Sequence, residues 1–174
     1  MNKKLLRCGL ALCTALCFLL SGCAMEKQEK TVEDFEKAVS KTGYILYEDN
    51  QDYEGKGFRV ERAMVALSED EQNRVEFYLC EDEAAAQRLY ESFGTDIDSA
   101  LSIAEEKEQK DFTGDNYQCH GAQCDENYFY RVQVGRTLLW ATGSEKGRKV
   151  ISKVVLKLES KIGRAVQQEC RDRS

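Results

Sequence analysis

The 174-residue chain contains no proline, a single histidine and fewer basic than acidic residues. The absence of proline fits a regular domain whose helices and strands are joined by short turns. The net charge of −6 argues against non-specific binding of nucleic acid, because such binding needs clustered lysine and arginine. The eight cysteines fall below the ~8–10% that marks a fold built on disulfides. At this length we expect one domain.

The sequence also lacks the motifs of common catalytic sites. It has no glycine-rich phosphate loop, no HExxH zinc motif and no GxSxG nucleophile motif. A pair of carboxylates could act among the 31 acidic residues, but no pattern locates such a pair. We therefore expect a role other than catalysis and predict no catalytic residue.

The first 20 residues have the organisation of an export signal. Lys3, Lys4 and Arg7 make the start basic, and an uncharged run from Gly9 to Leu20 follows. This run is too short to cross a bilayer core of ~30 Å. The order of a basic start and a short apolar run therefore predicts a signal peptide rather than a transmembrane helix.

The four residues Leu20-Ser21-Gly22-Cys23 follow this run and resemble the lipobox of bacterial lipoproteins. In that family the cysteine thiol receives a diacylglyceryl group, and cleavage then makes the cysteine the new N-terminus. The resemblance implies that residues 1–22 are removed and that Cys23 carries a lipid, the only cofactor-like group expected. It also implies that the protein is anchored to the cell membrane, outside the cytoplasm. A plain secretory signal with an incidental cysteine is the alternative.

Removal of residues 1–22 changes the balance of the chain. The mature protein has 152 residues and a net charge of −9, from 22 basic and 31 acidic residues. A domain of this size buries ~68–70% of its surface and can fold without disulfides. We expect a lipidated cysteine and polar tether at 23–30, a single domain at 31–168 and a tail at 169–174.

Hydrophobic periodicity and turn signals predict an α+β domain, with helices packed on one face of an antiparallel sheet. The expected order is helix, two strands, helix, two strands, helix, a layout similar to that of small lipoproteins of Gram-positive bacteria. That likeness implies no activity. The expected helices lie at 32–42, 82–93 and after Ser144, and the expected strands at 63–67, 75–79, 128–134 and 137–142, with a short strand in 44–62, a strand at 116–120 and a helical extension in 95–111.

The final predicted hairpin is the most informative one. Glycine suits the first position of a type II′ turn, so Gly135-Arg136 should join the two strands. Position n then pairs with position 271 − n, which places Val132 opposite Leu139 on the core face. The other face carries an aromatic and arginine cluster in which Arg131 pairs with Trp140: Phe129, Arg131, Gln133, Leu138 and Trp140.

This cluster is the predicted binding face. Aromatic residues and arginine dominate interface cores, so the cluster would suit a protein or cell-wall partner if no helix covers it. The alternative is a second small core, covered by residues 112–126 or by a long loop.

The four cysteines that remain after the anchor are Cys80, Cys119, Cys124 and Cys170. A hairpin loop made of the four residues between Cys119 and Cys124 would bring these two to disulfide distance. Free thiols are the alternative. His120 lies between them, but structural zinc needs four ligands and the chain has no second histidine, so we expect no metal site.

The sequence thus leads to the hypothesis of a lipid-anchored extracytoplasmic domain with a binding or accessory role. A small cell-surface hydrolase that uses carboxylates, or a purely structural component of the envelope, is the alternative.

Overall fold

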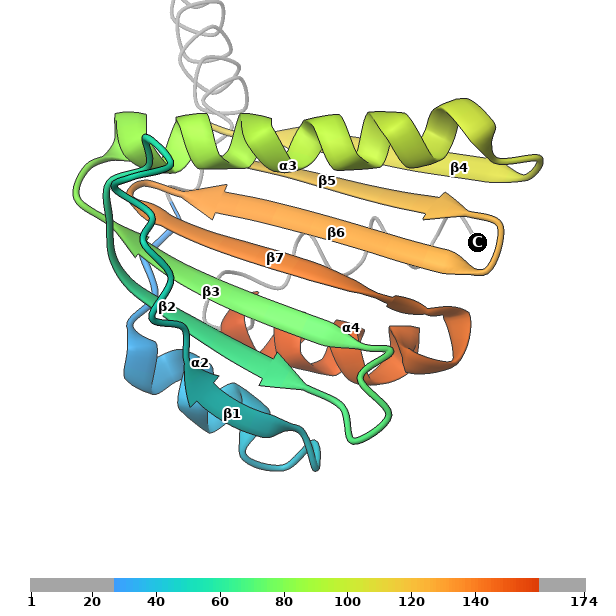
Figure 1. The fold of residues 1–174 in the computed structure, drawn as a ribbon, viewed down its shortest axis with the longest axis horizontal. Coiled ribbons are helices and arrows are strands. Elements are labelled where there is room, and N and C mark those ends of the chain that lie inside the picture. The colour runs from blue at the N-terminus through green and yellow to red at the C-terminus, as the bar shows by residue number, and fades with distance from the viewer. Residues whose placement is uncertain (1–26, 160–174) are drawn as a thin grey trace, which may run out of the picture.

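The computed structural model describes residues 27–159, so Cys23, Cys170 and the predicted tail lie outside the described residues. Seven strands form one antiparallel sheet in the order β1-β2-β3-β7-β6-β5-β4 (Figure 1). The strands are β1 (Ile45–Glu48), β2 (Val60–Leu67), β3 (Arg74–Cys80), β4 (Lys107–Thr113), β5 (Tyr117–Cys124), β6 (Asn127–Val134) and β7 (Thr137–Ser144), and the helices are α2 (Val32–Val39), α3 (Glu83–Ile103) and α4 (Glu145–Glu159).

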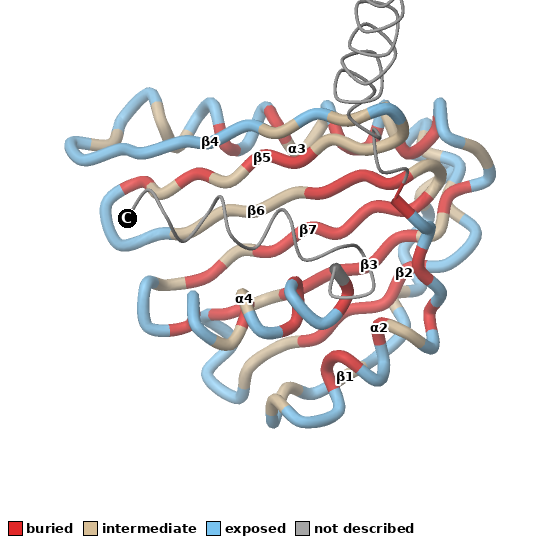
Figure 2. Tube along the Cα trace, turned by 180° about the vertical axis from the view of Figure 1, so that it is seen from behind, coloured by how far each residue is buried: buried red, intermediate tan, exposed pale blue. Residues whose placement is uncertain are grey.

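The helices cover both faces of the sheet. Helices α2 and α4 pack on one face, seen in Figure 2, and α3 packs on the other, seen in Figure 1. The α+β class and the single domain are confirmed, but the prediction that all helices pack on one face is wrong. The central strands are apolar on both sides: Ala63 to Ala66 of β2 are all buried, as are four residues in a row in β3. A sheet with two apolar faces needs a layer on each.

Each face has its own hydrophobic core. The first core lies between the sheet and helices α2 and α4, and it includes Phe35, Phe77, Leu139 and Ile151. The second lies between the sheet and α3, and it includes Tyr78, Leu89, Ile97, Leu138 and Trp140.

The hairpin of β6 and β7 has the predicted register and turn. Val134 pairs with Thr137 and Val132 with Leu139, which is the predicted pairing of position n with position 271 − n. Gly135 has a φ of +53°, a conformation that glycine adopts without steric cost. The hairpin of β2 and β3 is also present, but Val65 lies opposite Glu76, and Met64 lies opposite Phe77. The alternation therefore splits the apolar residues of β2 between both faces.

Helices α2 and α3 each begin directly after a residue whose side chain caps them. Thr31 and Asp34 form a capping box at the start of α2, and the Asp82 carboxylate accepts a hydrogen bond from the Ala85 N–H at 2.6 Å at the start of α3. Helix α3 does not end before Gly94 but continues to Ile103, so the helical extension predicted in 95–111 is right as far as Ile103 and wrong beyond it, where Lys107–Thr113 form β4. Strand β4 was not predicted because it is highly charged and exposed, so its sequence lacks the alternation of apolar and polar residues that indicates a strand.

The first described residues, Lys27 to Lys30, lie on the end of the sheet rather than apart from it. Both lysines are buried, and Lys27 exchanges backbone hydrogen bonds with the Asn116 side chain. This part of the predicted tether is therefore held against the domain. Among the residues that the structure describes, no helix combines the length and the apolar character needed to cross a bilayer.

Candidate functional site

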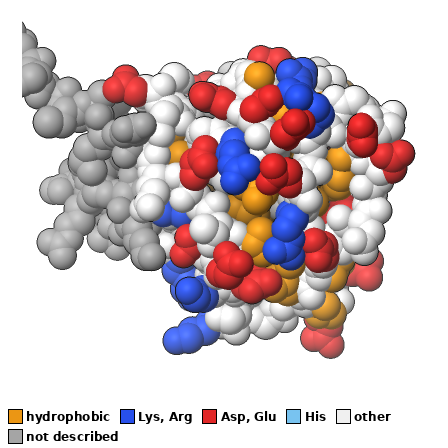
Figure 3. Space-filling model, turned by 90° about the vertical axis from the view of Figure 1, so that its left-hand side faces the viewer, with side chains coloured by type: hydrophobic (Ala, Val, Ile, Leu, Met, Phe, Trp, Pro, Cys, Tyr) orange, Lys and Arg blue, Asp and Glu red, His pale blue; other side chains and the backbone are white. Residues whose placement is uncertain are grey.

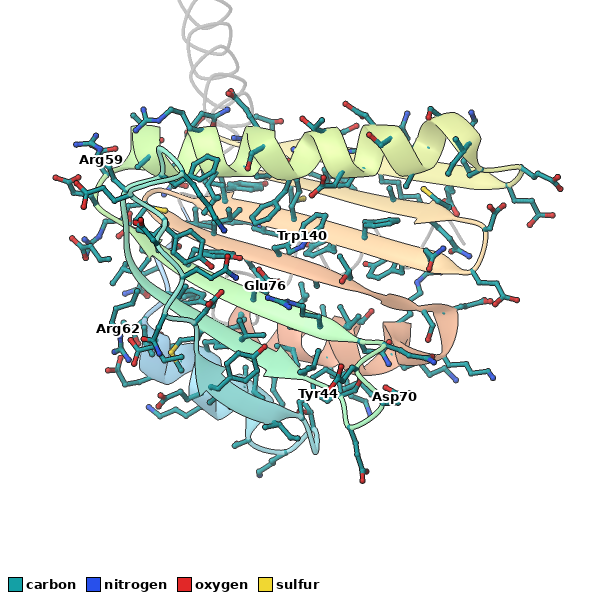
Figure 4. The ribbon with its side chains drawn as sticks, viewed as in Figure 1. Tyr44, Arg59, Arg62, Asp70, Glu76 and Trp140 are labelled. Atoms are coloured by element: carbon teal, nitrogen blue, oxygen red, sulfur yellow. The ribbon has the colours of Figure 1, made fainter. Side chains whose placement is uncertain are left out.

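The predicted binding face lies beneath helix α3. Trp140 is only 6% exposed and stacks on Phe93 of α3, with ring centroids 4.7 Å apart and planes 4° apart (Figure 4). Leu138 is fully buried, and Phe129 packs against the same core. The grouping of these residues on one face is confirmed, but their availability to a partner is not. The cover is α3 itself rather than residues 112–126.

Arg131 pairs with Trp140 across the strands, as predicted, but its guanidinium group contacts helix α3 instead of the indole ring. The guanidinium carbon lies 4.1 Å from the centre of the Tyr90 ring, and Nη1 donates a hydrogen bond to the Tyr90 carbonyl oxygen at 2.5 Å. Arg131 therefore holds α3 on the sheet.

The predicted disulfide between Cys119 and Cys124 is excluded by the fold. Both residues belong to the continuous strand β5 and not to a loop. Five residues of extended strand separate their Cα atoms by ~17 Å, and an odd spacing places the side chains on opposite faces. A disulfide needs Cα atoms within ~7 Å. The predicted hairpin loop is wrong because the strand expected at 116–120 continues to Cys124 as the eight-residue strand β5.

His120 points from β5 toward the α3 face, where its Nδ1 lies 2.6 Å from the Asp111 carboxylate of β4. Its Nε2 is buried and has no hydrogen-bond partner among the described atoms. Nowhere in residues 27–159 are three or more His, Cys, Asp or Glu side chains grouped to hold a metal ion.

Glu76 is the most deeply buried carboxylate in the described chain, at 5% exposed (Figure 4). It accepts a hydrogen bond from the Tyr78 hydroxyl and forms an ion pair with Arg74. Burial raises the pKa of Glu76 above its ordinary value, despite the opposing effect of both partners. Burial likewise raises the pKa of Tyr78. Glu76 is therefore a buried, hydrogen-bonded carboxylate next to Tyr78 of the second core.

A groove on the opposite face of the sheet is the best candidate for a binding site. We call it the α4 groove, and its volume is about 290 Å³. Helix α4 packs mainly on β7 and β6, so the groove lies beside it, over β4, β5 and β6. The side chains that line it come from the strands (Glu108, Gln109, Lys110, Phe112, Gln123, Tyr128, Tyr130) and from α4 (Arg148, Ser152, Val155, Leu156), with Gly121 in the floor.

Gly121 explains the hollow in the floor of the groove. It lies in the middle of β5, between Lys110 of β4 and Tyr130 of β6. A Cβ atom at this position would lie 3.4 Å from the Tyr130 ring, in van der Waals contact, so the glycine leaves the floor open beside that ring. Glycine inside a strand weakens the strand and often marks a bulge, a bend or a close approach by a ligand or another backbone. It is also the one sequence signal that could have revealed this site.

The groove combines aromatic rings with hydrogen-bonding groups. Tyr128 and Tyr130 stack with centroids 6.4 Å apart and planes 11° apart. Arg148 of α4 lies 5.3 Å from the centre of the Tyr128 ring and donates a hydrogen bond to the Gln123 side chain at 3.0 Å. Such a surface suits a ligand with an apolar group flanked by polar groups.

Charge at the mouth of the groove is partly balanced. Lys110 and Glu108 form an ion pair at 2.9 Å, and this hydrogen-bonded lysine lowers the pKa of the glutamate. Glu108 is the one carboxylate that lines the groove, so the arrangement does not present two convergent acids. It fits binding better than carboxylate catalysis.

Comparison with known proteins gives only distant structural likenesses. No family model and no curated protein matches the chain. A GTP-binding regulator from Thermotoga maritima is similar over 75% of this chain and 89% of its own, with 10% identity and a TM-score of 0.41. The extracellular domain of PknH from Mycobacterium tuberculosis is similar over 79% of this chain and 74% of its own, with 8% identity and a TM-score of 0.27.

Proposed function

We propose that this protein is a lipid-anchored, extracytoplasmic domain that binds a partner in the cell envelope through the α4 groove. The lipobox Leu20-Ser21-Gly22-Cys23 supports the anchor, because it follows a basic start and an apolar run at the expected spacing. The hollow that Gly121 leaves in the groove floor is the observation that carries the binding role. Two acyl chains would keep the domain on the membrane stably.

The nature of the partner follows from the lining of the groove. Tyr128, Tyr130 and Phe112 offer apolar surface, while Gln123 and Arg148 offer hydrogen bonds at its side. We expect a protein segment or cell-wall polymer that inserts an apolar group into the hollow. An accessory role in an envelope complex follows from such binding.

Crosslinking on intact cells tests the proposal. A photo-crosslinking amino acid at Leu156, which lines the groove and is 39% exposed, should capture a discrete partner. The same amino acid at Ile103, an 85% exposed position at the end of α3, is the matched control and should capture none. Gly121→Leu should abolish capture from position 156 because the new side chain fills the hollow.

Two outcomes would contradict the proposal at different points. Equal products from positions 156 and 103 would reject the groove as the binding site. A Cys23→Ala variant should leave the membrane fraction and appear in the medium or periplasm. If that variant still sediments with membranes and wild type carries no lipid by mass spectrometry, the anchor is rejected.

A further inference from the structure

The segment Lys27–Lys30 is fixed to one end of the sheet. The Lys27 N–H donates to the Asn116 side-chain oxygen at 2.8 Å, and the Asn116 side-chain amide donates to the Lys27 carbonyl at 2.6 Å. The Lys27 ammonium also lies 3.8 Å from the centre of the Tyr117 ring. These contacts place Lys27 against the turn that joins β4 to β5.

Glu29 attaches the same segment to a second turn. Its carboxylate accepts a hydrogen bond from the Arg136 N–H at 2.7 Å, in the turn between β6 and β7, and its other oxygen lies 3.6 Å from the Arg136 side chain. We call this end of the sheet, formed by residues 27–30, 114–116 and 135–136, the tether end.

The α4 groove lies toward the other end of the sheet. There β5 ends at Cys124, β6 begins at Asn127, and α4 begins at Glu145. Strands of eight residues separate the two ends by ~27 Å. The turn at Asp125 and Glu126 marks this second end, which we call the groove end.

We infer that the tether end is the surface that the protein presents to the bilayer, with the groove end pointing away from it. This inference rests on the proposed lipid on Cys23. Lys27 follows Cys23 by four positions, and an extended chain covers those four steps in at most ~14 Å. This length is about half of the distance between the two ends. A lipid at Cys23 therefore brings the tether end to the headgroups and leaves the α4 groove accessible to partners beyond the membrane.

The charges of the tether end indicate how it meets the lipid. Arg136 pairs with Glu29 and, at 3.2 Å, with Glu61, and beside the tether end, where β2 begins and β3 ends, Arg59 pairs with Glu81 at 2.9 Å and also with Asp82. Figure 3 faces this end and shows acidic and basic side chains side by side. Because most of these charges are paired, the end is no basic patch, and its orientation should not depend on anionic lipid.

Quenching by spin-labelled lipid tests the orientation. The lipidated full-length protein is reconstituted in vesicles that carry nitroxide headgroups. A fluorescent amino acid is placed at Asp115 in the tether end or at Glu126 in the groove end. Both are exposed acidic positions, and they lie in the turns at the two opposite ends of β5. We expect several-fold stronger quenching at position 115 than at 126, on zwitterionic and on anionic vesicles alike.

Flotation separates the failure of the inference from the failure of the anchor. Protein that floats with the vesicles but shows equal or reversed quenching would overturn the orientation and leave the anchor standing. Wild type that does not float would reject the anchor, and the orientation with it. Asn116→Ala removes the contact with Lys27 and should reduce the difference between the two positions without preventing flotation.

Discussion

At the scale of single residues, Glu76 shows how burial and pairing oppose each other. Taking a carboxylate out of water costs more than an ion pair usually returns. Glu76 has an ion pair with Arg74 and a hydrogen bond from Tyr78, yet its pKa is raised because burial dominates. Ionisation of Glu76 is therefore less favourable in the folded protein than in the unfolded chain.

The pH dependence of stability follows from this shift. Between the ordinary pKa of glutamate and the raised folded-state value, the folded protein binds more protons than the unfolded chain. The free energy of unfolding should therefore fall as pH rises through this window, by ~1.4 kcal/mol for each unit of pKa shift. Glu76→Gln should remove that fall and should not lower stability at pH 7, because the Arg74 side chain reaches water.

Urea unfolding between pH 4 and 8 measures this effect. Glu105→Gln, which changes an exposed carboxylate, serves as the control and should keep the wild-type pH profile. A wild-type profile that rises with pH over this window, relative to that of Glu76→Gln, would contradict the assignment.

At the scale of elements, Gly94 lets α3 lie close to the sheet. A Cβ atom at this position would come within 2.4 Å of Arg131 Nη1. Arg131 is fixed there by its hydrogen bond to the Tyr90 carbonyl and by its contact with the Tyr90 ring. The glycine is thus an approach site for an arginine rather than the end of a helix.

Gly94→Ala should destabilise the protein, although alanine favours helices over glycine by ~1 kcal/mol. The reason is that displacing Arg131 sacrifices a hydrogen bond from a charged group, worth about 1.5–3 kcal/mol. In an Arg131→Met background the same change should become stabilising. Denaturant unfolding of the four proteins gives the coupling energy. Ser99→Ala, on the exposed side of α3, is the control and should change the free energy of unfolding equally in the wild-type and Arg131→Met backgrounds. If the effects of Gly94→Ala and Arg131→Met on that free energy simply add, Gly94 and Arg131 are not in contact.

An element could be predicted from the sequence where residues close together in the chain fix its position. The β6–β7 hairpin could be predicted to the residue because a two-residue turn fixes its register. The register of β2 and β3 could not, since a six-residue connection and an irregularity between Val60 and Arg62 leave several alignments open. Strand β4 is recognised only by its pairing with β5.

At the scale of the whole molecule, the second helix layer decides which residues a partner can reach. Trp140 is the only tryptophan of the chain and lies between the sheet and α3. Its stacking on Phe93 connects the two layers. The residues that were predicted to bind a partner instead hold the domain together.

Trp140→Ala should therefore cost about 3–5 kcal/mol in the free energy of unfolding. Tyr47→Ala, which removes a 40% exposed aromatic residue of β1 on the same face of the sheet, should cost far less. Native protein should also resist acrylamide quenching of its tryptophan fluorescence until it unfolds. Strong quenching in the native state, with little loss of stability in Trp140→Ala, would mean that α3 does not cover this face.

The sequence by itself determined the features that depend on neighbouring residues. It predicts the start of α2 after Thr31, the tight turn at Gly135-Arg136, the two faces of the last hairpin and the lipobox-like segment around Cys23. The structural features rest on turn geometry, capping or periodicity within a few residues, whereas the segment around Cys23 stays a prediction from its resemblance to a lipobox.

Only the tertiary structure decided which surfaces are covered. The position of α3 turned the Phe129, Arg131, Leu138 and Trp140 cluster into a core, and the length of β5 separated Cys119 from Cys124. The α4 groove arises because α4 covers only part of its face and Gly121 leaves a hollow beside it. Alternation along a strand separates its two faces, but which layer covers each face depends on segments distant in the chain.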